Sequence, residues 1–280
     1  MIEIVKYDNI ELMKGDCLDA MKVLEDNSID AVICDPPYGT TACKWDSVIN
    51  LDLMWKELNR IVKPNGSKVI FAQQPFTSVL VVSNIKQYRH KWNWVKDKSA
   101  NFMVAKGQPL KYCEEVIVFN SNGYLQHHNA TKKCATYNPQ MREGKGSTRK
   151  YTENERKGHL LEINHRDNAT PVISYGNSHK QRYPKDNLEQ FSTVHKNRLH
   201  PTQKPILLME YLIRTYTNEG ETVLDFTMGS GSTMVACIET KRKAIGIERN
   251  EDYFNIAKKR VEEKKEEKDN EPPTLFNAQT

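Results

Sequence analysis

The sequence predicts a doubly wound, Rossmann-like α/β domain built around a mostly parallel sheet. Two observations predict this class. A short apolar run at 29–34 leads directly into the tetrad Asp35-Pro36-Pro37-Tyr38, and a second run at 221–226 is followed by a glycine-containing loop, a helical pattern and a third apolar run at 244–248. Units of strand, loop and helix form parallel sheets, and their ligands bind where the strands end.

The other elements are predicted from periodicity and turn residues, in chain order. The first of them are a helix at 51–62, a turn at Pro64-Asn65-Gly66 and a strand at 67–72. Two further strands are predicted at 90–95 and 115–119, two further helices at 232–240 and 251–268, and a disordered tail at 269–280. The helix at 251–268 ends in alternating charges, which is typical of a solvated face.

The tetrad suits chemistry on the amino group of a nucleic-acid base. The lone pair of such an amine is delocalised into the ring, so acceptors for its hydrogens would make the nitrogen a better nucleophile. The Asp35 carboxylate and the Pro36 carbonyl are the candidate acceptors, Pro37 stiffens the turn, and Tyr38 offers a flat face to a flipped base. The structural alternative is a polyproline turn that merely ends a strand.

The loop Asp225-Phe226-Thr227-Met228-Gly229-Ser230-Gly231 is typical of a nucleoside-binding site. Glu248 ends the following strand, a position from which an acidic side chain binds ribose hydroxyls. The loop lacks the Gly-Lys-Ser/Thr ending of a phosphate-binding loop, which favours a cationic ligand without phosphate, such as S-adenosylmethionine. Close packing of a helix on a strand is the alternative reason for the glycines.

Together these motifs resemble the beta class of amino-methylating DNA methyltransferases, in which the catalytic half precedes the cofactor half. The resemblance covers about 12–119 and 199–260. It implies that Asp16, in Gly15-Asp16-Cys17, contacts the cofactor adenine, and that the segment His200-Pro201-Thr202-Gln203-Lys204-Pro205 closes over the methionine end, with Lys204 facing the carboxylate. The implied cofactor-binding residues are Asp16, Cys17, His200, Thr202, Lys204, Asp225, Phe226, Gly229, Gly231, Thr233 and Glu248, and the implied catalytic residues are Asp35, Pro36, Pro37 and Tyr38.

The mechanism that the resemblance implies is direct displacement of the methyl group from the sulfonium by the target nitrogen. Methylation of a cytosine ring carbon would need a cysteine after a proline, and the sequence has none. Adenine N6 is the first prediction, because cytosine-N4 members usually show serine where Asp35 stands, and cytosine N4 is the alternative. RNA and protein glutamine are less favoured substrates, and a DNA-binding module without catalysis is the alternative from another class.

Charge points to a nucleic-acid partner. The net charge is +5, but residues 121–200 contain fourteen Lys or Arg and seven Asp or Glu, a net of +7, so the rest carries 5 − 7 = −2. We therefore expect a target-recognition insert at 121–198 that contacts double-stranded DNA, between a catalytic half at 1–120 and a cofactor half at 199–268. The structural alternative for this segment is an ordinary hydrophilic loop exposed to solvent.

Several further expectations concern loops, aromatic residues and the cellular setting. Residues 39–46 are expected to form a loop over the pocket, in which Lys44 and Trp45 are candidates to contact the displaced strand; the alternative is a pair that simply packs and is solvated. The resemblance implies an aromatic residue that helps hold the flipped base, and the candidates are Trp92, Trp94 and Phe102, with a core position as the alternative for a buried Trp. The six cysteines lack paired spacing, so neither a metal site nor disulfides are expected. No apolar run has membrane-spanning length, so a cytoplasmic protein is expected. The resemblance leaves a homodimer and a cognate restriction endonuclease open as partners.

Overall fold

The computed structural model describes residues 2–39, 47–99, 101–122, 135–143, 181–193, 199–200 and 203–270. The chain separates into two compact units, one formed by Met1–Asn138 with Lys185–Thr280 and the other by Pro139–Pro184. In the smaller unit, β7 (Arg142–Glu143) pairs antiparallel with β8 (Gln181–Arg182). The predicted division at 120/121 and 198/199 stays a prediction, and Lys44, Trp45 and the tail at 271–280 lie outside the described residues.

The larger unit contains a nine-stranded sheet in the order β1-β2-β11-β10-β3-β4-β6-β5-β9. Its strands are β1 (Glu3–Tyr7), β2 (Ile10–Lys14), β3 (Ile29–Cys34), β4 (Val62–Ala72), β5 (Tyr88–Val95), β6 (Cys113–Asn120), β9 (Asn187–Leu188), β10 (Thr222–Asp225) and β11 (Lys243–Glu248). From β2 to β4 in this order all neighbours run parallel, whereas β6 is antiparallel to both β4 and β5. The predicted, mostly parallel α/β fold is therefore confirmed.

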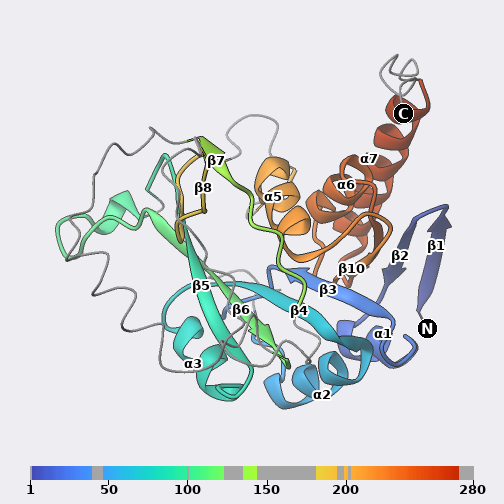
Figure 1. Ribbon diagram of the computed structural model, residues 1–280, viewed down its shortest axis with the longest axis horizontal. Helices are drawn as coiled ribbons and strands as arrows, with labels where there is room; N and C mark the ends of the chain where they lie inside the picture. Colours follow the sequence, from blue (N-terminus) through green and yellow to red (C-terminus); the bar gives the residue numbers. More distant parts are fainter. Residues whose placement is uncertain are drawn as a thin grey trace, which may run out of the picture. The chain divides into compact units, whose positions relative to one another are not determined.

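Helices cover both faces of this sheet (Figure 1). One face carries α1 (Cys17–Lys22), α2 (Leu51–Ile61) and α3 (Phe76–Ser83), and the other carries α5 (Ile206–Tyr216), α6 (Ser232–Glu239) and α7 (Glu251–Asp269). Each layer buries its apolar side chains in its own core cluster. The arrangement is the doubly wound one, in which the loops at the strand ends remain free to form a site.

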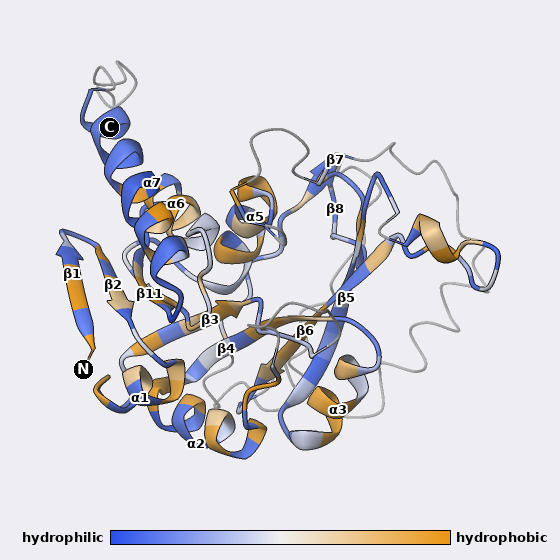
Figure 2. Cartoon of the chain, turned by 180° about the vertical axis from the view of Figure 1, so that it is seen from behind, coloured by the Kyte–Doolittle hydropathy of each residue, from blue (hydrophilic) through white to orange (hydrophobic). Residues whose placement is uncertain are grey.

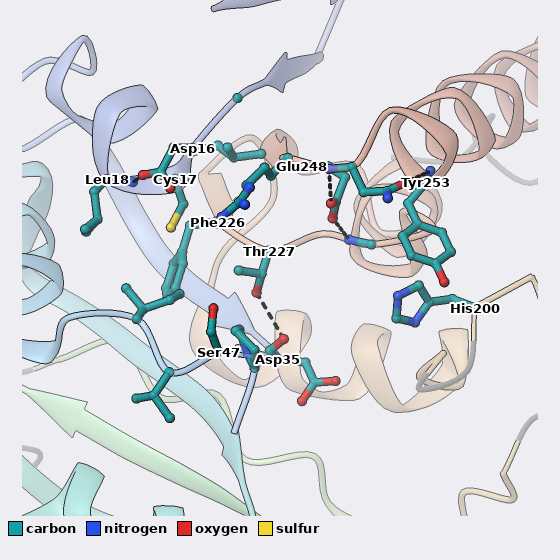
Figure 3. Close-up of a pocket in the computed structure, with 18 of the residues that line it drawn as sticks. Asp16, Cys17, Leu18, Asp35, Ser47, His200, Phe226, Thr227, Glu248 and Tyr253 are labelled. Carbon is teal, nitrogen blue, oxygen red and sulfur yellow. Dashed lines mark hydrogen bonds between the residues drawn. The ribbon is translucent and has the colours of Figure 1, made fainter. Parts of the chain in front are cut away.

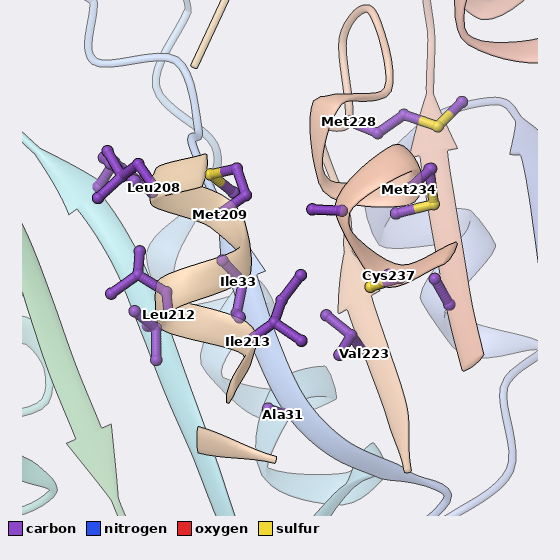
Figure 4. Packing of buried hydrophobic residues seen from close by; sticks show 14 of the residues in the cluster. Ala31, Ile33, Leu208, Met209, Leu212, Ile213, Val223, Met228, Met234 and Cys237 are labelled. Carbon is purple, nitrogen blue, oxygen red and sulfur yellow. The ribbon is translucent and has the colours of Figure 1, made fainter. Parts of the chain in front are cut away.

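Helix α5 had no counterpart among the predicted elements. On the helix face that meets the sheet, side chains including Leu208 and Leu212 are fully buried in one cluster with Ile33 of β3 and Val223 of β10 (Figure 4). This packing holds the chain that follows Lys204 against the two strands whose ends carry Asp35 and the glycine loop. Burial of such side chains contributes roughly 2 kcal/mol each relative to exposure.

The predicted turn at Pro64-Asn65-Gly66 was wrong, because these residues lie inside β4. The pairing of β3 with β4 shifts register between Ile29 and Ala31, so the extra residues are accommodated as an irregularity within the strand. A Cβ at Gly66 would lie 2.6 Å from the Asp30 carbonyl oxygen. The glycine is therefore required by close approach of two strands rather than by a reversal of the chain.

Candidate active site

The predicted site residues gather at the carboxyl ends of the parallel strands. Asp35 follows β3, the glycine loop follows β10, and Glu248 ends β11. A cavity of about 650 Å³ opens between these ends, within the usual size range of small-molecule sites (Figure 3). Its lining includes Asp16, Cys17, Asp35, Pro37, Ser47, Asn50, His200, Phe226, Thr227, Gly229, Glu248 and Tyr253.

A second, small cavity of about 30 Å³ is lined by several of the same residues. It shares Asp35, His200 and Gly229 with the larger cavity and adds Lys204, Asp225 and Thr233. Among the predicted residues that the structure describes, Pro36, Tyr38 and Gly231 line neither cavity, and Thr202 lies outside the described residues. The cofactor-binding and catalytic residues predicted from distant parts of the chain thus meet at one edge of the sheet.

Asp35 belongs to a cluster of buried and partly buried polar side chains, which we call the Asp35 cluster: Asp35, Tyr38, Lys96, Glu114 and Lys204. The Lys204 ammonium nitrogen lies 2.6 Å from Asp35 Oδ2 and 2.7 Å from Glu114 Oε1. Lys96 Nζ lies 2.5 Å from Glu114 Oε2. The Tyr38 hydroxyl donates to Asp35 and lies 3.2 Å from Glu114 Oε1. Two carboxylates therefore share two ammonium groups.

Burial and the neighbouring ammonium groups shift the pKa values of the two carboxyl groups in opposite directions. Burial raises the pKa of Asp35 above its ordinary value, and the Lys204 ammonium limits that rise. Burial would also raise the pKa of Glu114, but Lys204 and Lys96 together lower it to about 2. The two carboxylates hold the pKa of Lys204 above its ordinary value despite its burial. Lys204 is therefore a permanent cation beside the predicted catalytic carboxylate.

The structure adds two partners of Lys204 that the resemblance does not imply. Its ammonium is bound to Asp35 and Glu114, and its expected contact with the cofactor carboxylate stays a prediction. Glu114 was not predicted, since sequence offers only two adjacent acids, Glu114 and Glu115, at the start of a strand. Burial separates them: the side chain of Glu114 is 6% exposed and it belongs to the Asp35 cluster, while Glu115 pairs with the half-exposed Lys91.

Thr227 joins the glycine loop to the tetrad at 35–38. Its hydroxyl donates to the Asp35 carbonyl oxygen at 3.0 Å and lies 2.9 Å from the Cys34 sulfur (Figure 3). Its backbone N–H contacts the Asp225 carboxylate at 3.2 Å. The end of β3 and the loop after β10 are consequently held in fixed relation at the floor of the cavity.

The acidic residues that end β10 and β11 are held by hydrogen bonds. Asp225 accepts from the Thr233 hydroxyl as well as from Thr227, and burial raises its pKa to about 7 in spite of these bonds. Glu248 accepts from the backbone N–H of Gly229 at 2.9 Å and of Asn250 at 2.7 Å. Its carboxylate is thereby fixed at the cavity wall with acceptor capacity left for hydroxyl groups.

The other wall and the rim are formed by helix starts and aromatic rings. Asp16 caps α1 by accepting from the Leu18 N–H, and burial raises the pKa of Cys17 to about 12, so its thiol is no nucleophile. His200 packs edge-to-face on Tyr253 with ring centroids 4.1 Å apart. Burial and the charge of Lys204 lower the His200 pKa to about 4, so its ring is neutral at physiological pH.

The aromatic candidates for holding a base divide by burial. Trp92 and Trp94 are core residues, whose indole nitrogens donate to the Tyr216 hydroxyl and the Phe191 carbonyl oxygen, each at 2.7 Å. Phe102 instead is 72% exposed. The two tryptophans are thus core residues held by packing, as buried tryptophans usually are.

Comparison with known proteins finds similar sequences and structures over most of the chain. A family model named N6_N4_Mtase and described as DNA methylase matches residues 29–259. Type II methyltransferase M.HpaI of Haemophilus parainfluenzae is 27% identical over 273 residues, which cover 90% of this chain and 74% of that protein.

Two solved structures are similar to most of the chain. The M1.HpyAVI–SAM complex has a TM-score of 0.56 and 24% identity, and the match covers 90% of this chain and 98% of that one. The cytosine-N4-specific PvuII DNA methyltransferase has a TM-score of 0.62 and 16% identity, with coverage of 93% and 92%. The family match extends over most of this sequence, and the protein therefore belongs to the N6/N4 family of DNA methyltransferases.

Proposed function

We propose that the protein transfers a methyl group from S-adenosylmethionine to the N6 amino group of an adenine flipped out of double-stranded DNA. The observation that carries this proposal is Asp35, a carboxylate held against the Lys204 ammonium at 2.6 Å, at the edge of a cavity sized for a nucleoside. An ionised carboxylate in that place accepts a hydrogen bond from an amino group, which a protonated acid cannot do at the same oxygen.

The cavity residues fit the proposed cofactor. Glu248 presents a fixed carboxylate for ribose hydroxyls, and Asp16, Cys17 and Phe226, which line the same cavity, would contact the adenine. Asp225 and Thr233, in the small adjoining cavity, would hold the methionine end. The similar M1.HpyAVI structure is a complex with SAM, which supports the same cofactor here.

S-adenosylmethionine supplies a methyl group activated by the positive charge of its sulfur. Asp35 and the Pro36 carbonyl accept the two amino hydrogens, which turns the lone pair of the nitrogen outward. The nitrogen–carbon bond then forms as the carbon–sulfur bond breaks, leaving a neutral thioether, and the amino proton leaves through Asp35 to solvent. The gain in rate comes from positioning and from a fixed electrostatic environment.

Cytosine N4 remains the alternative target, and a similar fold belongs to a cytosine-N4-specific enzyme. The presence of Asp35 favours adenine, because the cytosine-N4 members that this sequence resembles usually show serine at that place. The choice affects the charge of the site: serine would leave Lys204 with Glu114 as its remaining carboxylate partner in the Asp35 cluster. The contact of Asp35 with Lys204 and Tyr38 beside the cavity favours an enzyme over a silent DNA-binding module.

The partners and location that the sequence suggested remain proposals. The basic stretch at 121–198 is proposed to contact DNA phosphates, with homodimer formation and a cognate restriction endonuclease as further possibilities for the cellular system. The structure contains no helix, among the residues it describes, that is long and apolar enough to cross a membrane. No group of three or more His, Cys, Asp or Glu side chains suited to a metal occurs in the described part either.

The test is expression in a methylation-free bacterial host, followed by mapping of modified bases with single-molecule sequencing. Wild type is compared with Asp35→Ala and with Asp52→Ala, a control at an exposed aspartate in the first turn of α2. We expect adenine methylation in one sequence context from wild type and the control, none from Asp35→Ala, and S-adenosylmethionine binding by all three in calorimetry. Marks on cytosine would replace the adenine proposal, and failure to bind the cofactor would contradict the enzyme proposal itself.

A further inference from the structure

The connection between β5 and β6 presents large apolar side chains to solvent. Phe102 is 72% and Met103 85% exposed, and both belong to a short 3-10 turn at Phe102–Val104. Figure 2 shows this turn as an orange segment projecting beyond the ends of β5 and β6. Clusters of exposed apolar side chains on a folded domain mark a surface that meets a partner.

The same connection is held in a defined shape, so these side chains are presented rather than loosely attached. The Asn101 side chain accepts from the Lys111 N–H at 2.6 Å and donates to the Pro109 carbonyl oxygen at 3.2 Å. At its base, the Lys96 N–H donates to the Tyr112 carbonyl oxygen at 2.6 Å. We call residues 101–112 the β5–β6 tip.

Strand register places the β5–β6 tip at the same edge of the sheet as the catalytic tetrad. Cys34, which precedes Asp35, pairs with Ile70 of β4, and Ala72 of β4 pairs with Glu115. The chain therefore enters β6 close to the level at which β3 ends. Glu114, the second residue of β6, is itself a member of the Asp35 cluster.

Charge identifies the kind of partner that the tip fits. The twelve residues from 101 to 112 contain two lysines, Lys106 and Lys111, and no acidic residue. Both lysines are exposed. Apolar side chains flanked by cations suit a surface that combines phosphate groups with stacked rings, as the edge of an opened duplex does.

We propose that the β5–β6 tip is a wedge that enters the DNA stack when the target base leaves it, with Phe102 and Met103 filling the vacated space and Lys106 and Lys111 binding the adjoining phosphates. Inserted apolar side chains lower the free energy of the unstacked state, because they replace contacts that the flipped base has lost. The inference rests on the proposed transfer to a base in DNA, and it assigns the opening of the duplex to a segment outside the basic insert.

The test uses the double variant Phe102→Ala/Met103→Ala. Its matched control is Val82→Ala/Ile85→Ala, which removes two exposed apolar side chains, 76% and 60% exposed, that precede the start of β5 at the opposite end of the strand. Synthetic duplexes carry the motif mapped in the host genome, with the target base opposite either its normal partner or an abasic site. An unpaired target lowers the energy needed for flipping.

On the paired duplex we expect the tip variant to lose about ten- to a hundredfold in kcat/KM, the size typical of one or two lost stacking contacts. On the abasic duplex it should come within about threefold of wild type, because the duplex no longer has to be opened against a base pair. The control variant should match wild type on both duplexes, and all proteins should bind S-adenosylmethionine equally well.

Equal activity of the tip variant and wild type on the paired duplex would overturn the wedge. An equal loss on both duplexes would also overturn it, and a simultaneous change of mass in sedimentation would then assign the tip to contact with a second copy of the chain. If wild type binds the cofactor but modifies no DNA at all, the proposed function fails, which is a distinct result from failure of the wedge alone.

Discussion

Replacing Glu114 by Gln is expected to destabilise the folded protein by about 3 kcal/mol. Glu114 is 6% exposed and bridges Lys204 at 2.7 Å and Lys96 at 2.5 Å. The neutral amide leaves the Asp35 cluster with one uncompensated positive charge, and removal of one partner from a buried ion pair typically costs about 3–5 kcal/mol. The lower end applies because the amide oxygen still accepts one hydrogen bond from an ammonium group.

The assay is guanidinium or urea unfolding at pH 7.5 and low salt, with Glu115→Gln as the matched control. Glu115 is the next residue of β6, and its partner Lys91 has a side chain that is 43% exposed, so loss of that pair should cost at most about 1 kcal/mol. Adding Lys96→Met to Glu114→Gln restores neutrality and should recover at least about 1 kcal/mol. Equal effects of the two single substitutions, or no recovery in the double variant, would refute the assignment of a buried, charge-balanced cluster.

Three other variants follow from the same structure. Lys204→Met removes the cation that limits the rise of the Asp35 pKa, so the acidic limb of the pH–rate profile should move to higher pH, and an unmoved limb would contradict the pairing. Burial raises the Asp225 pKa to about 7, so between about pH 4 and pH 7 the folded state holds a proton that the unfolded chain has lost. The free energy of unfolding should therefore fall by up to about 4 kcal/mol as the pH rises through this range. Asp225→Asn should make that fall smaller, as measured by denaturant unfolding at pH 5 and pH 8. Gly231→Ala should be at least about 1 kcal/mol less stable to unfolding than Gly220→Ala. Both glycines have left-handed φ angles, 77° and 78°, but of these two only Gly231 would bring a Cβ within 2.9 Å of another atom, the Cβ of Ala257. Equal denaturation midpoints of the two variants would contradict this steric contact.

Much of the fold was accessible from local pattern. The predicted strand at 29–34 coincides with β3, and the predicted helix at 51–62 lies within one residue of α2. Both follow from short-range regularities: a continuous apolar run for a strand buried on both faces, and an apolar stripe of helical period after the capping residue Asn50. The turn predicted at Pro64-Asn65-Gly66 failed, because close approach of two strands demands glycine just as a reversal does.

For the site, the sequence by itself determined the chemistry of the groups: a carboxylate and carbonyls after one strand, glycines after another, and an acid after a third. The order of motifs also indicated the family, because spacing and residue type are properties of the linear chain. Residues that were predicted from the sequence also line the cavity. Asp16, His200, Phe226 and Glu248 meet there, although more than two hundred positions separate the first from the last.

Only the tertiary structure decided which charges face one another. Glu114 and Glu115 are alike in the sequence, yet one balances the buried ammonium of Lys204 and the partly buried one of Lys96 beside Asp35, and the other pairs near solvent. Lys204 likewise reaches Asp35, a contact that its motif did not imply. The physical reason is that the interaction of two charges depends on their separation and on exclusion of water, and both are set by how strands from distant parts of the chain align at one edge of the sheet.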